Sequence, residues 1–190
     1  MARDYKARNY IVQQAAKYGD QRLTDVLIRT LDIMVNTREP DGCMSNSVAL
    51  YVILRSFGYE PEFCYGLCVA PNGFEFYHAW LELGGEVLDI AVYGNSHFSS
   101  YWEYEQMLPV VFEKRDTAAI HYGNREFDQG WPESMISQAV KKSMEQYIAF
   151  CPNNGMWALI FRILNVTKSK EKKEELSRFI LKEPFNANDK

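Results

Sequence analysis

The chain has 190 residues, of which 47% are hydrophobic and 14% aromatic, and its formal net charge is −4. This length is sufficient for a single domain over residues 1–190 with a sizeable core, and the charge balance argues against nucleic acid as a partner. No apolar run reaches the ~18 residues of a membrane span, and the start of the chain lacks the long apolar core of a signal peptide. We therefore expect a cytoplasmic protein.

Two helices are expected at the start of the chain, over residues 3–17 and 21–35. In the second, apolar residues recur at spacings of three and four, and Asp20 is suited to cap its first turn. We expect these helices to lie across the core as a cover. The segment 37–42 contains proline and glycine, which predicts a loop.

A third helix is expected to begin near Cys43, where Asp41 is available to cap it. Its residues from 48 to 54 are apolar on most sides, which predicts that the helix is buried. Gly58 follows at the position where a glycine commonly ends a helix.

Three strands are expected next, over residues 62–70, 74–83 and 86–93. The pairs Asn72-Gly73 and Gly84-Gly85 each predict a tight hairpin turn, because these residues adopt positive φ angles at low cost. A buried helix followed by an antiparallel meander predicts an α+β fold.

The remainder of the chain is expected to be mainly helical. A short helix is predicted at 102–108 and a short strand at 110–113, whereas 115–132 is rich in turn-forming residues and has no clear assignment. Further helices are expected over residues 132–150, 153–166 and 168–182. The predicted organisation is a central part at 36–95 with helical additions at 1–35 and 133–183.

Cys43 is the first candidate for chemistry, because of its place at the start of a helix. A thiol attacks as the thiolate, and a helix N-terminus or a neighbouring imidazolium favours that form. The backbone amide of Cys43 is also available to an oxyanion at this position. Gly42 has no side chain, so it allows a substrate carbonyl to come close.

A base and a third group are expected on the strands that follow. If the two-glycine turn forms the loop, Leu83 lies opposite Glu86, and His78 then lies opposite Ala91. Asp89 becomes the diagonal neighbour of His78 on the same face of the sheet, ~7–8 Å away by Cβ. An aspartate there holds the imidazole ring and favours its charged form. A slip of one residue would separate the two side chains.

Other candidates on these strands and loops have simpler explanations. Trp80 shares the His78 face and either walls a substrate cleft or packs in the core. Cys64 and Cys68 are expected to be core residues, and the sequence has no spacing typical of a metal site. His97 and His121 are expected to be ordinary surface or structural histidines. The opposite face of the strands is apolar and is assigned to the core: Ala79, Leu81, Leu83, Leu88, Ile90 and Val92.

The order helix-Cys, strand-His, strand-Asp, with its local sequence, resembles the transglutaminase-like superfamily, which includes papain-like Cys-His-Asp enzymes. The matching words are Cys43 with its helix, RSFGYEPEFCYG at 55–66, HAWLE at 78–82 and GGEVLD at 84–89. Within the superfamily they are most similar to the lasso-peptide leader-processing protease, over residues 36–95. This resemblance implies a catalytic core there, with Cys43 as nucleophile, His78 as general base and acid, and Asp89 as the orienting group.

The expected function is thiol-dependent acyl transfer through a Cys43 thioester, with hydrolysis of a peptide or protein amide as the first choice. Transamidation, deamidation or acyl transfer by the same residues is the alternative, and the expected partner is a peptide, a protein or a small acyl substrate. Two other hypotheses stay open: a non-catalytic peptide- or protein-binding relative, and an interaction protein that uses its apolar segment 156–164. No metal or organic cofactor is implied. Four residues are conceivable as a second oxyanion donor: Gln13, Gln14, Asn36 and Tyr65.

Overall fold

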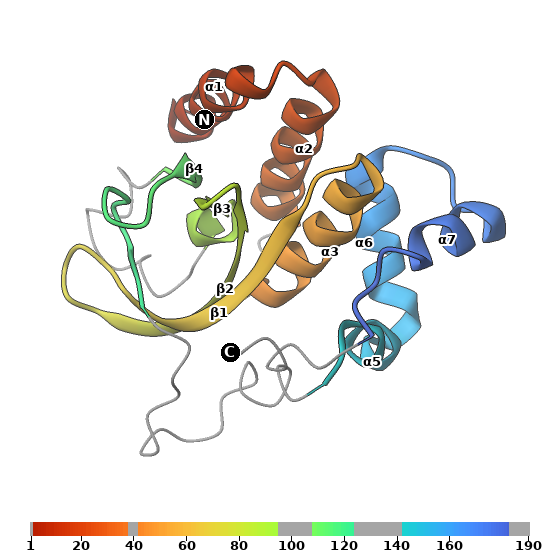
Figure 1. Ribbon diagram of the computed structural model, residues 1–190. Coiled ribbons are helices and arrows are strands. Elements are labelled where there is room, and N and C mark those ends of the chain that lie inside the picture. Colours follow the sequence, from red (N-terminus) through yellow and green to blue (C-terminus); the bar gives the residue numbers. More distant parts are fainter. Residues whose placement is uncertain (1, 38–41, 95–107, 124–141, 183–190) are drawn as a thin grey trace.

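The computed structural model describes residues 2–37, 42–94, 108–123 and 142–182. Within these residues, a curled antiparallel sheet of five strands in the order β4-β3-β2-β1-β5 packs against a layer of helices (Figure 1). The elements are α1 (Ala2–Ala15), α2 (Gln21–Thr37), α3 (Cys43–Ser56), β1 (Pro61–Val69), β2 (Glu75–Leu83), β3 (Glu86–Asp89), β4 (Val110–Glu113), β5 (His121–Tyr122), α5 (Met144–Phe150), α6 (Gly155–Leu164) and α7 (Lys170–Ser177). The expected α+β fold is confirmed.

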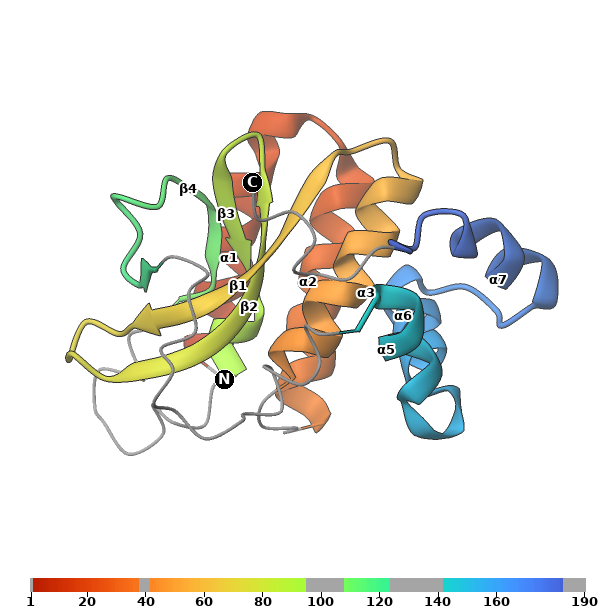
Figure 2. The ribbon, with the colours of Figure 1, turned by 60° about the horizontal axis from the view of Figure 1, so that its bottom comes forward.

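Helix α3 occupies the centre of the molecule. It contacts β1 and β2 on one side and α6 on the other, which Figure 2 shows as three successive layers. Every residue from Val48 to Leu54 is buried, because the helix has apolar neighbours all around it. The predicted start at Cys43 is confirmed. The N-cap residue is Gly42 rather than Asp41, which lies outside the described residues. Gly58 follows the helix with a φ of 93°, as its predicted place at the end requires.

The two predicted hairpin turns set the register of the sheet. Gly73 has a φ of 81°, and Gly84 and Gly85 have φ angles of 60° and 78°, which glycine adopts without strain. Leu83 consequently lies opposite Glu86, as expected, and the pairing continues along β2 and β3.

The third strand is shorter than the sequence predicts. Strand β3 ends at Asp89, and the chain then turns into a short 3-10 helix, Ala91–Gly94. The expected pairing of His78 with Ala91 is therefore wrong, since the pairs between β2 and β3 end at Leu81 and Leu88. The early turn places the Val92 amide next to the Asp89 side chain and ends the pairing of β3 with β2.

Both faces of the sheet are covered by apolar side chains. The helix-side cluster includes five of the six residues assigned to this face from the sequence, while Val92 belongs to the opposite cluster because it follows the end of β3. The opposite cluster contains Cys64, Cys68, Ala70, Phe76, Trp80, Val87, Val92, Val110, Ile120 and Tyr122. The candidate face of the sheet is thus itself the floor of a second, smaller core.

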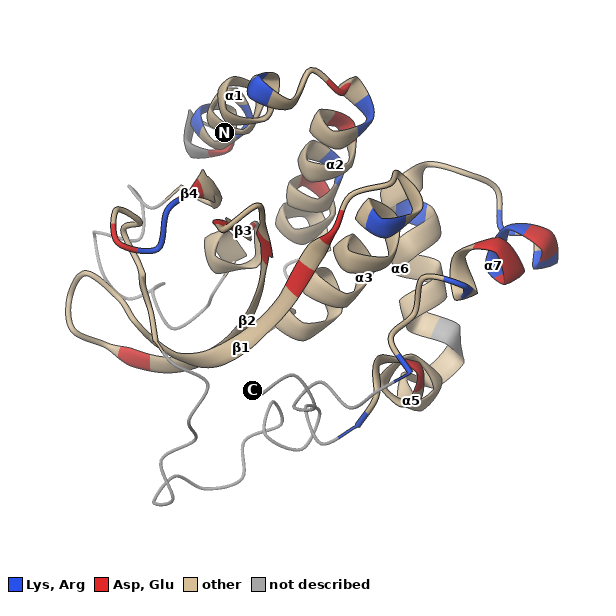
Figure 3. Cartoon of the chain, in the orientation of Figure 1, with Lys and Arg blue, Asp and Glu red and all other residues tan. Residues whose placement is uncertain are grey.

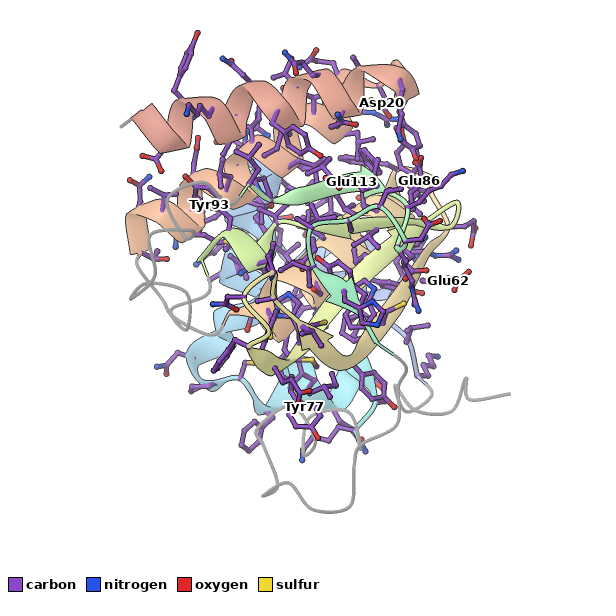
Figure 4. The ribbon with its side chains drawn as sticks, turned by 90° about the vertical axis from the view of Figure 1, so that its left-hand side faces the viewer. Asp20, Glu62, Tyr77, Glu86, Tyr93 and Glu113 are labelled. Carbon is purple, nitrogen blue, oxygen red and sulfur yellow. The ribbon has the colours of Figure 1, made fainter. Side chains whose placement is uncertain are left out.

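Helix α1 and the 3-10 turn after it (Ala16–Tyr18) form polar contacts with β3 and with the 3-10 helix that follows β3. The Tyr93 hydroxyl donates to Asp4 (2.9 Å), and Lys17 donates to Glu86 (2.6 Å). In Figure 4, Tyr93 lies toward the start of the helix and Glu86 toward its end. At the start of α2, Asp20 accepts a hydrogen bond from the amide two residues on, which confirms it as a helix cap. The expected cover over the core is therefore held by specific contacts.

The C-terminal helices pack beyond α3. Helix α5 begins at Met144 behind a Ser143 capping box, so the expected helix over 132–150 is described only in its last part, and residues 132–141 lie outside the description. Helix α6 confirms the prediction at 153–166. Charges of both signs gather on α7, whereas α3 is charged only at its C-terminal end (Figure 3). No helix in the described ranges is long and apolar enough to cross a membrane.

Candidate active site

Cys43 lies where helix α3 has unused backbone donors. The first hydrogen bond within the helix runs from the Asn46 amide to the Gly42 carbonyl (2.9 Å). The amides of the three residues before Asn46 therefore have no partner inside the helix. A carbonyl oxygen next to Cys43 would meet these N–H groups and the positive end of the helix dipole.

Gly42 lies close to the side chain of Asn46. The Asn46 side-chain amide donates to the Gly42 carbonyl (2.8 Å). A Cβ atom added to Gly42 would lie 2.9 Å from Asn46 Nδ2, which is closer than real Cβ contacts. The absence of a side chain at Gly42 thus leaves space for the Asn46 side-chain amide, whose hydrogen bond stabilises the start of α3. The contact of Gly42 with a substrate carbonyl stays a prediction.

A serine links the nucleophile's helix to the strand that carries the imidazole. Ser47, one turn after Cys43, donates from Oγ to the backbone carbonyl of Ala79 (3.0 Å) in β2. Ala79 follows His78 directly, and both Ser47 and Ala79 are buried. This hydrogen bond fixes the distance between the start of α3 and the middle of β2.

His78 and Asp89 form a buried pair, as expected from their shared face. His78 Nε2 and Asp89 Oδ2 are 2.7 Å apart, and the two residues are 2% and 1% exposed. Asp89 also accepts from the Val92 amide at Oδ1 (3.0 Å), which is the consequence of the turn after β3. A third donor, the Tyr122 hydroxyl, reaches Oδ2 at 2.7 Å. The carboxylate that accepts from these three donors is buried and has no access to solvent.

Tyr122 is a site residue that the sequence did not indicate. It belongs to β5, a two-residue strand that pairs with the end of β1. A strand of two residues has no periodicity, and it lies in the segment 115–132 for which no element could be assigned. Nothing in the local sequence distinguishes this tyrosine from the others in the chain.

The electrostatics of the pair favour a charged imidazole. Burial alone would lower the pKa of His78, but the charge and hydrogen bond of Asp89, together with a hydrogen bond and charge from Cys43, raise it to about 10. Because Nε2 faces Asp89, the ring nitrogen left for Cys43 is Nδ1. The arrangement therefore places one imidazole between a thiol and a carboxylate.

A second tyrosine reaches the start of α3 from the C-terminal helices. The Tyr147 hydroxyl in α5 lies 3.0 Å from Ser45 Oγ, two residues after Cys43. Burial raises the pKa of Tyr147 to about 12, with smaller effects from Ser45, Cys151 and Cys43. The phenol is thus a protonated hydroxyl near the N-terminal end of α3. Like Tyr122, Tyr147 lies in a part of the chain that the sequence did not connect to the site.

The other candidates lie in varied surroundings. Trp80 is fully buried, and its ring packs against that of Tyr122 at 4.9 Å between centroids. Its indole Nε1 donates to Glu82 (3.1 Å), and the guanidinium of Arg115 lies over the ring. The predicted contact of Trp80 with substrate stays a prediction. His121 is exposed, and His97 lies outside the described residues. In the described ranges, no three metal-binding side chains gather in one place. All four cysteines are free.

The four residues considered as second oxyanion donors are scattered. Gln13 and Gln14 are on α1, the former exposed, Asn36 is exposed near the end of α2, and Tyr65 is buried in β1. Gln13, Gln14 and Asn36 form none of the described hydrogen bonds around Cys43, His78 or Asp89. The role of all four as donors stays a prediction.

Comparison with protein families agrees with this architecture. Residues 2–103 match the model of the transglutaminase-like superfamily. The chain belongs to this superfamily. Its members are typically cysteine-dependent acyl-transfer enzymes or proteases. The matched region includes α1 and α2, so it begins well before the segment 36–95 on which the resemblance was based.

Two further searches gave no relative. No curated protein and no solved structure matches the chain. The closeness of this transglutaminase-like chain to the lasso-peptide leader-processing protease therefore stays a prediction.

Proposed function

We propose that this transglutaminase-like protein is a thiol acyl-transfer enzyme that hydrolyses an amide bond of a peptide or protein. One observation supports the proposal most directly: a buried His78–Asp89 pair, joined at 2.7 Å, whose imidazole also interacts with the thiol of Cys43. In this proposal Cys43 is the nucleophile, His78 is the general base and acid, and Asp89 orients the ring.

The first half-reaction forms a thioester. In the resting site the proton of the Cys43 thiol already lies on His78, and the thiolate attacks the substrate carbonyl carbon, which forms the S–C bond. The oxyanion accepts hydrogen bonds from the backbone amides at the start of α3. The C–N bond then breaks, and His78 returns the proton to the departing amine.

The second half-reaction releases the acyl group. His78 takes a proton from a water molecule as the water oxygen attacks the thioester carbon. The S–C bond breaks, the product leaves as a carboxylic acid, and the Cys43–His78 pair is restored. If an amine attacks in place of water, the same residues perform a transamidation.

The chain contains its own controls for a test of cysteine activation. We would measure alkylation by iodoacetamide against pH, with mass spectrometry to locate the modified cysteine. Cys151 is more exposed than Cys43 and has a pKa raised by burial, while Cys64 and Cys68 are fully buried. Exposure alone would make Cys151 react first. Activation would make Cys43 react first at about pH 6.5, roughly two units below an ordinary thiol's ~8.5.

Two results would decide the proposal. Preferential labelling of Cys43 that disappears in a His78→Ala variant supports it. Equal or slower labelling of Cys43 than of Cys151, with no effect of His78→Ala, overturns it and favours a binding protein that retains the fold.

Hydrolysis and transfer can be separated by isotope labelling. A mixture of unlabelled peptides would be incubated with the protein in H₂¹⁸O, with and without methylamine. Amide-bond hydrolysis puts ¹⁸O into new C-terminal carboxylates, whereas deamidation puts it into glutamate side chains. Formation of methylamides with no ¹⁸O uptake would replace hydrolysis by transfer as the reaction, and Cys43→Ala is the control for every product.

A further inference from the structure

Asp89 is held from three separate segments of the chain. His78 from β2 and Tyr122 from β5 share its Oδ2 atom, each at 2.7 Å, and the Val92 amide reaches Oδ1 at 3.0 Å. Donors on both oxygens prevent the carboxylate from rotating about its Cβ–Cγ bond without loss of a hydrogen bond. The plane of the carboxylate therefore sets the direction from which Nε2 of the imidazole donates.

The backbone around Tyr122 is built for close approach to this carboxylate. The Gly123 amide donates to the Leu67 carbonyl (2.9 Å), and a Cβ atom added to Gly123 would lie only 2.4 Å from that oxygen. A glycine is thus required for β5 to close against β1. On the other side, the Tyr122 ring packs against Trp80. Both contacts direct the hydroxyl to Asp89.

The packing of Tyr122 does not by itself require its hydroxyl. A phenylalanine ring would fill the same space against Trp80 with no buried polar group to satisfy. We propose that Tyr122 is a positioning residue, which holds the Asp89 carboxylate in the one orientation that aligns the His78 imidazole with Cys43. This inference rests on the proposed function, and it adds a fourth member from outside the region that matches the superfamily.

The hydroxyl is a constant donor across the working pH range. Burial, followed by the charge of Asp89, raises the pKa of Tyr122 well above 10. The tyrosine therefore stays protonated and does not place a second negative charge beside Asp89. The hydroxyl acts only through Asp89. Its removal should therefore change the alignment of the His78 imidazole and leave the imidazole itself in place.

The test compares Tyr122→Phe with a matched variant elsewhere. Tyr59 also donates to an aspartate, Asp20, at 3.2 Å, but it follows the C-terminal end of α3, whereas Cys43 lies at the N-terminal end. Iodoacetamide labelling of Cys43 at about pH 6.5 is expected to fall about tenfold in Tyr122→Phe, which is the order expected for one lost hydrogen bond to a buried charge. Tyr59→Phe should label at the rate of the unmodified protein.

A spectroscopic readout separates alignment from general damage. The proton on His78 Nε2 that points at Asp89 should give a downfield NMR resonance, assigned by its loss in His78→Gln. In the unmodified protein, it should show a cross-peak to the ring protons of Tyr122, because both groups donate to one oxygen. Tyr122→Phe should shift or broaden this resonance, and Tyr59→Phe should leave it unchanged.

The outcomes distinguish this inference from the proposed function. If Cys43 is not activated in the unmodified protein, the proposed function fails, and the inference fails with it. If Cys43 is activated and depends on His78, but Tyr122→Phe keeps the rate and the resonance, only the role of Tyr122 is overturned. Absence of the cross-peak in the unmodified protein would overturn it without any substitution.

Discussion

The region that matches the superfamily, residues 2–103, and the region from residue 108 onward contribute different groups to the candidate site. The first contains the thiol of Cys43, the imidazole of His78 and the carboxylate of Asp89. The second adds neutral hydroxyls, one from Tyr122 on Asp89 and one from Tyr147 on Ser45. This difference indicates that the proposed chemistry belongs to the matched region, while the alignment of its groups depends on contacts from the second.

The largest expected effect separates the two described histidines, one from each region. His78→Gln should lower the labelling of Cys43 by iodoacetamide at about pH 6.5 by about 100-fold, which is the lower range of a general base's contribution. His121→Gln should leave the rate unchanged, because this histidine is exposed at β5. The rates would be measured by mass spectrometry. If Cys43 were labelled at similar rates in both variants, His78 would have no special role in activating the thiol.

The next effect concerns the buried carboxylate. Asp89→Asn should lower the free energy of unfolding by about 3 kcal/mol, because it leaves a buried pair without its negative partner. Asp20→Asn is the matched control: Asp20 pairs with Arg22 at the surface and caps α2, and asparagine caps helices equally well. Urea unfolding should show a change below about 1 kcal/mol for the control. A loss as small in Asp89→Asn would contradict the importance of the pair.

The pH dependence of stability should report the same imidazole. The pKa of His78 is raised from 6.5 to about 10 in the folded protein. Its contribution to stability is therefore complete below pH 6.5 and is lost as the pH rises toward 10. Urea unfolding of the unmodified protein should show this decline relative to His78→Gln, whose own curve lacks it. Parallel curves across this range would show that the imidazole is not held in its charged form.

The smallest expected effect measures the contact between the two regions directly. Ser45→Ala and Tyr147→Phe each remove one side of the hydrogen bond between α3 and α5. Each should lower the free energy of unfolding by about 1 kcal/mol. In the double variant the losses should fall short of their sum by about 0.5–1 kcal/mol. Full additivity, measured by urea unfolding, would show that the two regions are not coupled at this point.

Much of the first region could be predicted because its signals are local. The apolar pattern after a loop indicates that α3 begins at Cys43, and the two glycines at 84 and 85 set which residues face each other across β2 and β3. The face shared by His78 and Asp89 follows from that register. The length of β3 could not be predicted, because the apolar residues after Asp89 suit a strand as well as the 3-10 turn that they form.

The sequence by itself determined the order of the elements, the start of α3 at Cys43 and the hairpin register that brings His78 to Asp89. These depend on turn geometry and on periodicity over neighbouring residues. Only the tertiary structure decided that Tyr122 donates to Asp89 and that Tyr147 reaches the first turn of α3. Both contacts join segments far apart in the chain, and their formation depends on how β5 and α5 pack, for which no short stretch of sequence has a pattern.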